Sequence, residues 1–492
     1  MTAFGVRDGQ DAEDLDVEEA LALVNHGNSS PGPAGDSAVR PDGDRSPASA
    51  AAHGEDRGGR NGDDRAGRPG AGHGGASGSR DAQGHTSSRH RATATPWAEA
   101  RTIAGRAARS TAARRTPVSV SLVDALGLVL AAPLTALTDL PSFDTSAMDG
   151  WAVAGPGPWA VRDEDVLAGH AQPAPLADGE AARIATGARI PPDTTAVLRS
   201  EHGRIDEKGR LHPTGESRHG QDIRPRGQEC RSGEQLLPTG AVVTPAVLGL
   251  AAAAGYDTLA AVPRPRVEVL VLGDELLTEG RPHDGLIRDA LGPMLPPWLR
   301  GLGAEVVALR RLGDDAEALY RALTTSGADL IITTGGTASG PVDHVHPTLS
   351  RVGAELLVDG VQVRPGHPML LARLQDGRHL VGLPGNPLAA VSGLVTLAEP
   401  LLRTLAARPA PEPYTLPLKE AVHGHPHDTR LVPAVLRGDH AVPLHYNGPA
   451  MLRGIAAADA LAVVPPGGAR AGQETELLDL PWAAAGIDAC FT

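Results

Sequence analysis

The second half of the chain alternates between short apolar runs and segments with helical spacing of apolar residues. The apolar runs show no regular alternation with polar residues, which is expected for strands covered on both faces of a sheet. Strands and helices that alternate in this way are typical of a parallel α/β domain, which we place at residues 264–408. The predicted strands are VEVLVLG (267–273), AEVVALR (304–310), ADLIITTGG (328–336) and HLVGLPGNP (379–387), and the predicted helices are 315–325 and 388–407.

Short apolar runs separated by turn residues predict β-rich segments on both sides of this domain. The fold class that follows is a multidomain α/β protein. Its central parallel-sheet domain is accompanied by a small β-rich insert and by a β-rich C-terminal domain. The other predicted domains are a helical linking domain (95–150 plus 236–263), the insert (151–235) and the C-terminal domain (409–492), whose strands are expected near 414–418, 460–465 and 475–480.

The linking domain has three recognisable elements. Residues 96–108 predict a helix. Residues 118–131 predict a strand followed by a helix that Gly127 interrupts, and residues 244–259 predict a helix that ends at Gly255. The apolar face of the first helix consists of Trp97, Ala100, Ile103 and Ala104.

Composition separates the beginning of the chain from the rest. Hydrophobic residues make up 41% of the 492 residues, close to the globular norm. Residues 27–93, however, are dense in Gly, Pro, Ser, Asp, Arg and His and contain almost no large apolar residues. Such a stretch cannot offset its ordering entropy by burial. We therefore predict a disordered tail over residues 1–94, with one short acidic helix at Asp14–Val24.

Charge and cysteine usage narrow the possible partners and location. The net charge of −14 argues against nucleic acid as the main partner, because phosphate binding needs a basic surface. The two cysteines, Cys230 and Cys490, are too few for a disulfide framework. The start of the chain is acidic and resembles no signal peptide, and we find no apolar run of about 18 residues, the length of a membrane helix. A cytoplasmic protein without membrane contact is expected.

Three loops at predicted strand ends carry candidate chemistry, since ligands of doubly wound sheets bind beyond the carboxyl ends of the strands. Asp274 and Glu275 can hold a hard cation such as Mg²⁺, although acidic residues also favour a helix N-terminus. The Gly335–Gly336 turn can expose N–H groups to a phosphate oxygen. Gly385 lets a ligand approach a helix N-terminus, and Asn386 can instead cap that helix.

Two other patterns do not indicate a site. GAGHGG, at residues 70–75, matches a dinucleotide-binding fingerprint but follows no strand and lies in the predicted tail. The alternating His423, His425 and His427 suit a metal by spacing, but Pro426 lies among them and no further ligand is apparent. We interpret these histidines as part of a solvated loop.

Five motifs, in order, resemble those of the MoeA/gephyrin family of molybdopterin molybdenumtransferases. The resemblance runs from about Trp97 to the C-terminus. The most distinctive motif is the first, because its sequence is hard to explain by chance. The motifs are DLPSFDTSAMDGWAV (139–153), RIATGARIPPDTTAVLRSE (183–201), RPRVEVLVLGDEL (264–276), TTGGTASGPVD (333–343) and GLPGNPLAA (382–390).

The resemblance implies a four-domain subunit that forms a homodimer. Its reaction takes adenylated molybdopterin and molybdate to molybdenum cofactor and AMP, with a divalent metal such as Mg²⁺. The active site lies between the α/β domain of one subunit and the SAMDG-bearing domain of the other. By the same resemblance, the catalytic residues are Glu275, Asp149 and Asp343, the metal ligands are Asp274, Glu275 and Asp343, and the residues that bind substrate or phosphate are Gly335, Gly336, Ser339, Thr186, Arg364, His367, Gly385 and Asn386.

The sequence also departs from the family pattern. Lys-Pro-Gly-Lys-Pro is replaced by RPGHP (364–368), and the serine after LPGNP by Ala389. Pro293, Pro296 and Pro297 are expected to disrupt the helix that follows Asp289. These departures leave open a second hypothesis, a non-catalytic paralogue that binds a molybdopterin-like ligand or acts as a dimeric scaffold. A nucleotide-dependent hydrolase has little support, because no Gly-Lys-Ser/Thr phosphate loop is present.

Overall fold

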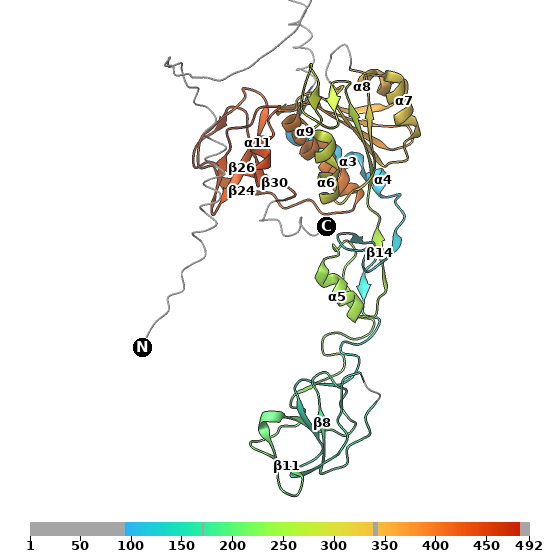
Figure 1. Ribbon diagram of the computed structural model, residues 1–492, viewed down its shortest axis with the longest axis vertical. Coiled ribbons are helices and arrows are strands. Elements are labelled where there is room, and N and C mark those ends of the chain that lie inside the picture. The colour runs from blue at the N-terminus through green and yellow to red at the C-terminus, as the bar shows by residue number, and fades with distance from the viewer. Residues whose placement is uncertain (1–93, 170–171, 338–342, 483–492) are drawn as a thin grey trace, which may run out of the picture. The chain divides into compact units, whose positions relative to one another are not determined.

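The computed structural model describes residues 94–169, 172–337 and 343–482 (Figure 1). The predicted tail up to residue 93, with its acidic helix and its glycine-rich segment, lies outside the described residues. So do Ser339 and Cys490.

The first described helix, α3 (Trp97–Ala107), packs against the end of the α/β domain. Its buried residues are Trp97, Ala100 and Ala104, which confirms the predicted helix and most of its apolar face, whereas Ile103 is only partly buried. The Trp97 Nε1–H donates a hydrogen bond of 3.0 Å to the hydroxyl of Thr396. The neighbouring helix α4 (Arg109–Ala112) is short and has no buried residue.

We expect Trp97→Phe to lower the free energy of unfolding by about 1–3 kcal/mol, because the buried Thr396 hydroxyl loses its donor. Urea unfolding measures this change. In a double-mutant cycle with Thr396→Val, the double variant should lose less stability than the sum of the single variants. Additive losses would mean that the two side chains do not interact.

The linking region contains two small sheets and helix α5 (Pro245–Ala253). This helix confirms the prediction of a helix that ends at Gly255, and the Thr244 side chain caps its first turn. The helix predicted within residues 118–131 is wrong: after the first strand the chain makes turns and then forms a second strand, because Leu130 bonds to the backbone of Ala241. The strands are β2 (Val118–Ser121), β3 (Val129–Leu130), β4 (Leu134–Thr135), β13 (Gln235–Leu237) and β14 (Thr258–Val262).

The insert is built on a six-stranded sheet of order β10-β11-β7-β8-β6-β9, which confirms its predicted β-rich character. Both faces of its strand β6 are buried: Trp151 and Val153 join one apolar cluster, and Ala152 joins the other together with Ala154, which follows the strand. The strands are β6 (Gly150–Val153), β7 (Trp159–Val161), β8 (Glu180–Ile184), β9 (Ala196–Arg199), β10 (Gly203–Ile205) and β11 (Arg210–Pro213), with the pair β5 (Thr145–Ser146) and β12 (Ile223–Arg224) and the short helix η1 (Ser200–His202) beside them.

The α/β domain has a six-stranded sheet of order β18-β15-β19-β23-β22-β20. The four strands predicted from apolar runs are present and parallel, but β22 runs antiparallel to both of its neighbours, β23 and β20, so the sheet is mixed rather than wholly parallel. Its elements are β15 (Arg266–Leu272), β18 (Glu305–Leu312), α7 (Ala316–Thr325), β19 (Leu330–Thr334), α8 (Val345–Arg351), β20 (Glu355–Asp359), β22 (Leu370–Arg373) and β23 (His379–Leu383), with a small pair β16 (Leu276–Leu277) and β17 (Ile287–Arg288).

Helix α6 (Leu291–Gly301) contains Pro296 and Pro297 in its interior. The predicted disruption by proline is therefore wrong. Proline removes a hydrogen bond within a helix, but packing of an apolar face can outweigh that loss. Here the buried face includes Leu295, Trp298 and Leu299.

A long apolar helix follows the last parallel strand. It consists of α9 (Pro387–Gly393), a π-helical turn η2 (Leu394–Ala398) and α10 (Glu399–Leu405). It is the one helix among the described residues that is long and apolar enough to cross a membrane, judged by length and composition. Since 78% of its most apolar stretch is buried inside the protein, these properties are also those of a core helix.

The C-terminal domain is a seven-stranded sheet that also takes in two strands from earlier in the chain. Strand β1 (Thr95–Pro96) pairs with β21 (Val361–Arg364), and β21 pairs with β26 (Thr429–Arg437). The remaining elements are β24 (Tyr414–Pro417), β27 (His440–Pro443), β28 (Ala460–Val464) and β30 (Glu474–Asp479), with the pair β25 (Val422–His423) and β29 (Gly468–Ala469) and helix α11 (Arg453–Ala456). The three predicted strands of this domain are confirmed.

Candidate active site

The carboxyl ends of the four parallel strands form an edge lined by glycines, which we call the glycine rim (Gly273, Gly313, Gly335 and Gly385). The Gly335 N–H donates a hydrogen bond of 2.8 Å to the Leu383 carbonyl. A Cβ atom on Gly385 would meet only the Cα of Gly335, at 3.7 Å. The structure thus brings together the two glycine turns that the sequence indicated for phosphate binding, and leaves space beside them.

Two carboxylates lie against the glycine rim. A Cβ atom on Gly313 would be 2.3 Å from Asp274 Oδ1, and one on Gly273 would be 2.4 Å from Glu275 Oε2. Both carboxylates therefore occupy room that larger residues at the rim would fill. Asp274 lies against Gly313, at the end of β18, and Glu275 lies against Gly273, at the end of β15.

The start of helix α9 is occupied by the C-terminal domain. The N–H groups of Leu388 and Ala389 donate to the Pro449 carbonyl at 2.9 and 3.2 Å. The Asn386 side chain makes no cap hydrogen bond. Two amides of this helix N-terminus are therefore engaged, and Gly385 is the part of LPGNP that lies next to the other glycine turn.

The two basic residues of RPGHP have partners of their own. Arg364 Nε donates at 2.8 Å to the carboxylate of Asp428, which is only 2% exposed. His367 Nδ1 lies 2.9 Å from the Val361 carbonyl and donates a hydrogen bond to it. Arg364 is thus tied to the C-terminal domain, whereas His367 is tied to its own strand.

Asp149 and Thr186 meet in the insert, each coming from one of the two motifs that suggested it. Asp149 Oδ1 accepts hydrogen bonds from the Thr186 N–H at 2.7 Å and from the Thr186 hydroxyl at 3.0 Å. These two donors, the backbone one foremost, hold the pKa of Asp149 below its usual value. The exposed carboxylate is therefore ionised at neutral pH.

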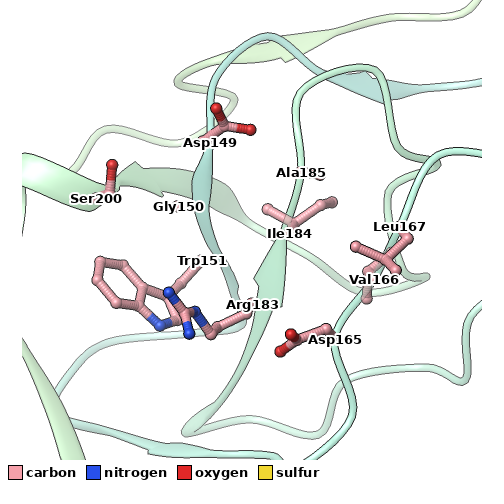
Figure 2. A pocket seen from close by; sticks show the side chains of 10 residues that line it. All are labelled: Asp149, Gly150, Trp151, Asp165, Val166, Leu167, Arg183, Ile184, Ala185 and Ser200. Carbon is pink, nitrogen blue, oxygen red and sulfur yellow. The ribbon is translucent and has the colours of Figure 1, made fainter.

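A cavity of about 380 Å³ opens beside Asp149 (Figure 2). Strands β6 and β8 contribute Trp151, Arg183 and Ile184 to its lining, and the loop before β8 contributes Asp165 and Leu167. No sequence pattern indicated a functional role for any of these five residues. The loop gave no signal, because its residues follow no strand or helix pattern.

The remaining predicted residues are placed as follows. Asp343 is partly buried and directly precedes the N-cap residue of α8, His344. Ser339 lies outside the described residues. Asp149 directly precedes β6 and Thr186 follows β8 in the insert, whereas the glycine rim follows the strands of the α/β domain.

Comparison with known proteins connects this geometry to one family. Three family models match the chain in order: the MoeA N-terminal region (domains I and II) over residues 95–255, a probable molybdopterin-binding domain over 268–404, and the MoeA C-terminal region (domain IV) over 415–480. A Mycobacterium tuberculosis protein named molybdopterin molybdenumtransferase 2 is 34% identical over 372 residues, which cover 71% of this chain and 91% of that protein. The chain belongs to the MoeA family.

Further MoeA relatives agree with this assignment. The molybdopterin molybdenumtransferase of Staphylococcus aureus is 28% identical over 381 residues, covering 73% of this chain and 90% of that protein. Two crystal structures of MoeA proteins from Pyrococcus horikoshii share the fold, with TM-scores of 0.64 and 0.63 at 24% and 21% identity. They cover 79% and 78% of this chain and 99% of each matched chain.

A buried carboxylate lies just before helix α6. Asp289 is 4% exposed. Its carboxylate accepts from the Gly292 N–H at 2.8 Å and from Arg311 Nη2 at 2.9 Å. Asp289 therefore satisfies a backbone N–H in the first turn of α6 and ties that turn to β18.

No sequence pattern indicated Arg430, which lies directly opposite Arg364 where β21 pairs with β26. Its guanidinium donates to the His423 carbonyl and, at 3.1 Å, to Asn447 Oδ1. Both acceptors are neutral, and burial lowers the pKa of Arg430. The charge of Arg364 is balanced by Asp428, so Arg430 supplies the net positive charge at this strand pair.

The residues at the rim fit a metal shared with a substrate. Within 94–169, 172–337 and 343–482, no group of three or more His, Cys, Asp or Glu side chains forms a complete metal site. Mg²⁺, however, usually binds through one or two carboxylates together with substrate phosphates. Asp274 and Glu275, which lie against Gly313 and Gly273, could each supply an oxygen donor at the glycine rim.

Proposed function

We propose that this MoeA-family protein inserts molybdenum into adenylated molybdopterin, giving molybdenum cofactor and AMP. The names of its relatives support this activity. The observation that carries the proposal is the glycine rim, where two carboxylates lie beside two adjoining glycine turns. This arrangement suits a substrate that contains a phosphoanhydride and an associated cation.

The chemistry requires positioning and charge neutralisation more than covalent catalysis. The small residues Gly335, Gly336 and Gly385 let phosphate oxygens approach the backbone. Asp274 and Glu275, with Asp343, would hold Mg²⁺, which neutralises phosphate charge when bound. Arg430, next to Arg364, is suited to attract an anion, either molybdate or the substrate phosphates.

The active protein in this proposal is a cytoplasmic homodimer. Asp149 and Thr186 of one subunit would face the glycine rim of the other, so each site would draw on both chains. Asp149 is suited to accept a proton or to orient a hydroxyl, because its carboxylate is exposed and ionised. Cross-linking or sedimentation of the purified chain tests the oligomeric state.

The purified protein, supplied with adenylated molybdopterin, molybdate and Mg²⁺, should produce cofactor that activates a molybdenum-free apoenzyme. The Glu275→Ala variant should lose most of this activity. The control variant Glu279→Ala, which replaces an exposed glutamate just after β16, should keep it. Activation by the wild type no greater than by Glu275→Ala would refute turnover. That result would favour the non-catalytic alternative.

Replacing Arg430 by glutamine should raise the KM for the anionic substrates about tenfold or more, with a smaller effect on kcat, because one charge-assisted hydrogen bond is lost. Arg470→Gln, an exposed arginine of the same domain, is the matched control. Steady-state kinetics of AMP release measures both constants. An unchanged KM would remove Arg430 from the binding site.

A further inference from the structure

The cavity in the insert has walls held in place by backbone hydrogen bonds. The loop that carries Asp165 and Leu167 is joined to β8 through Val166, whose N–H donates to the Arg183 carbonyl at 2.7 Å. The Val166 carbonyl in turn accepts from the Ala185 N–H at 3.0 Å. The opposite side is strand β6, which begins next to Asp149. The cavity is therefore a preformed feature of one sheet.

The charges around the cavity disfavour a phosphate and favour a neutral ligand. Figure 2 shows Asp149 at one end of the cavity and Asp165 and Arg183 toward the other. Two carboxylates against one guanidinium would repel a phosphate group. Carboxylates accept hydrogen bonds, so the ligand must offer donors to Asp149 and Asp165, and an acceptor to Arg183.

The rest of the lining suits a flat, partly apolar group. Val166, Leu167 and Ile184 give the cavity an apolar side, and Leu167 is 48% exposed. Trp151, 7% exposed, also lines the cavity, and its buried Nε1–H has no hydrogen-bond partner among the described residues. A buried donor without a partner is unfavourable, and a ligand acceptor or a bound water can supply one.

We propose that this cavity binds the nucleoside half of the adenylated substrate. A ribose diol and an exocyclic amine supply the donors that the carboxylates require, and aspartate is a common partner of ribose hydroxyls. The purine ring supplies acceptors for Arg183 and a flat surface for Leu167. A volume of about 380 Å³ is at the lower end of the range for small-molecule sites and suits one nucleoside. The inference rests on the proposed function, because it assigns one part of that substrate to one part of the site.

Adenosine, which lacks phosphate, is the direct probe of this cavity. Equilibrium dialysis of the full chain with adenosine should show saturable binding. Asp165→Ala and Leu167→Arg should each raise the Kd at least about tenfold, the effect of losing roughly 1.4 kcal/mol of interaction. Asp163→Ala, an exposed aspartate that does not line the cavity, should leave the Kd unchanged.

Two results would overturn the assignment. One is the absence of saturable adenosine binding, or equal Kd values for the Asp163→Ala and Asp165→Ala variants. The other is binding of free pterin that displaces adenosine and is weakened by the same two variants, because the cavity would then hold the pterin half. Failure of the proposed function looks different: adenosine still binds and Asp165→Ala still weakens it, while no molybdenum is inserted. If insertion occurs, Asp165→Ala should raise the substrate KM with little change in kcat.

Discussion

Gly150→Ala is expected to lower the melting temperature of the insert by about 12 °C or more, given roughly 4–8 °C per kcal/mol for a domain of this size. A Cβ atom at this position would lie 2.0 Å from the Leu198 carbonyl oxygen and 2.9 Å from the Cα of Arg199. Both are backbone atoms of β9, which pairs with β6 at these residues. Relief of the clash would separate β9, the edge strand, from β6, so we expect a cost of about 3 kcal/mol or more, at the upper end for overpacking.

Differential scanning calorimetry measures this loss, and circular dichroism reports whether the β-rich insert melts separately. Gly215→Ala is the matched control, because a Cβ atom there would meet nothing within 4 Å. If Gly150→Ala and Gly215→Ala have the same melting temperature, the close approach of β6 and β9 does not exclude a side chain at residue 150. The glycine of the SAMDG motif is thus explained by strand packing.

Asp149→Asn should lower turnover by at least about 100-fold, the lower range for loss of a general acid or base, while leaving the insert folded. The asparagine oxygen can still accept both hydrogen bonds from Thr186, so the substitution removes charge with little change in shape. The measurement is the rate of AMP release, with melting temperature as the control for folding. Turnover within a few-fold of wild type would exclude Asp149 from the reaction.

A second variant tests the same carboxylate through pH. Thr186→Val removes the hydroxyl donor but keeps the stronger backbone donor, so the pKa of Asp149 should rise toward its ordinary value. Because the ionised form is the active one in this proposal, activity in the variant should fall at a higher pH than in the wild type as the solution is acidified. The alkaline side of the profile should not move. Superimposable acid limbs would show that Asp149 does not control this step.

The parts of the fold found from sequence are those in which local pattern and burial agree. Strands β15, β18, β19 and β23 were predictable because both faces of the sheet are covered, and helix α5 because Thr244 and Gly255 mark its ends. The pair β20 and β22 was not, because the reversed direction of β22 depends on its pairing with neighbouring strands rather than on local pattern.

Two local rules were overruled by tertiary contacts. The apolar spacing within residues 118–131 predicted a strand followed by a helix, but in place of the helix Val129 and Leu130 pair with β14. Proline should have broken α6, but the burial of Leu295, Trp298 and Leu299 maintains it. In both cases the deciding partners lie far away in the sequence.

The candidate site was predictable to the extent that motifs identify it. Asp149 and Thr186 came from two motifs, and the structure adds that they touch. Arg430 could not be found, because its importance comes from lying opposite Arg364 across a strand pair between domains. Asp165 and Leu167 could not be found either, because a loop without periodicity gives no indication that it forms the wall of a cavity.

The pairing of β1 with β21 affects how this chain can fold while it is being synthesised. Thr95 pairs with Val361, and Trp97 bonds to Thr396, so the partners of the first described elements emerge from the ribosome long after them. Until then the apolar face of α3 has no surface to cover it, and contacts so distant in sequence slow folding. We therefore expect nascent chains truncated before Val361 to bind chaperones or aggregate, even when the insert has already folded.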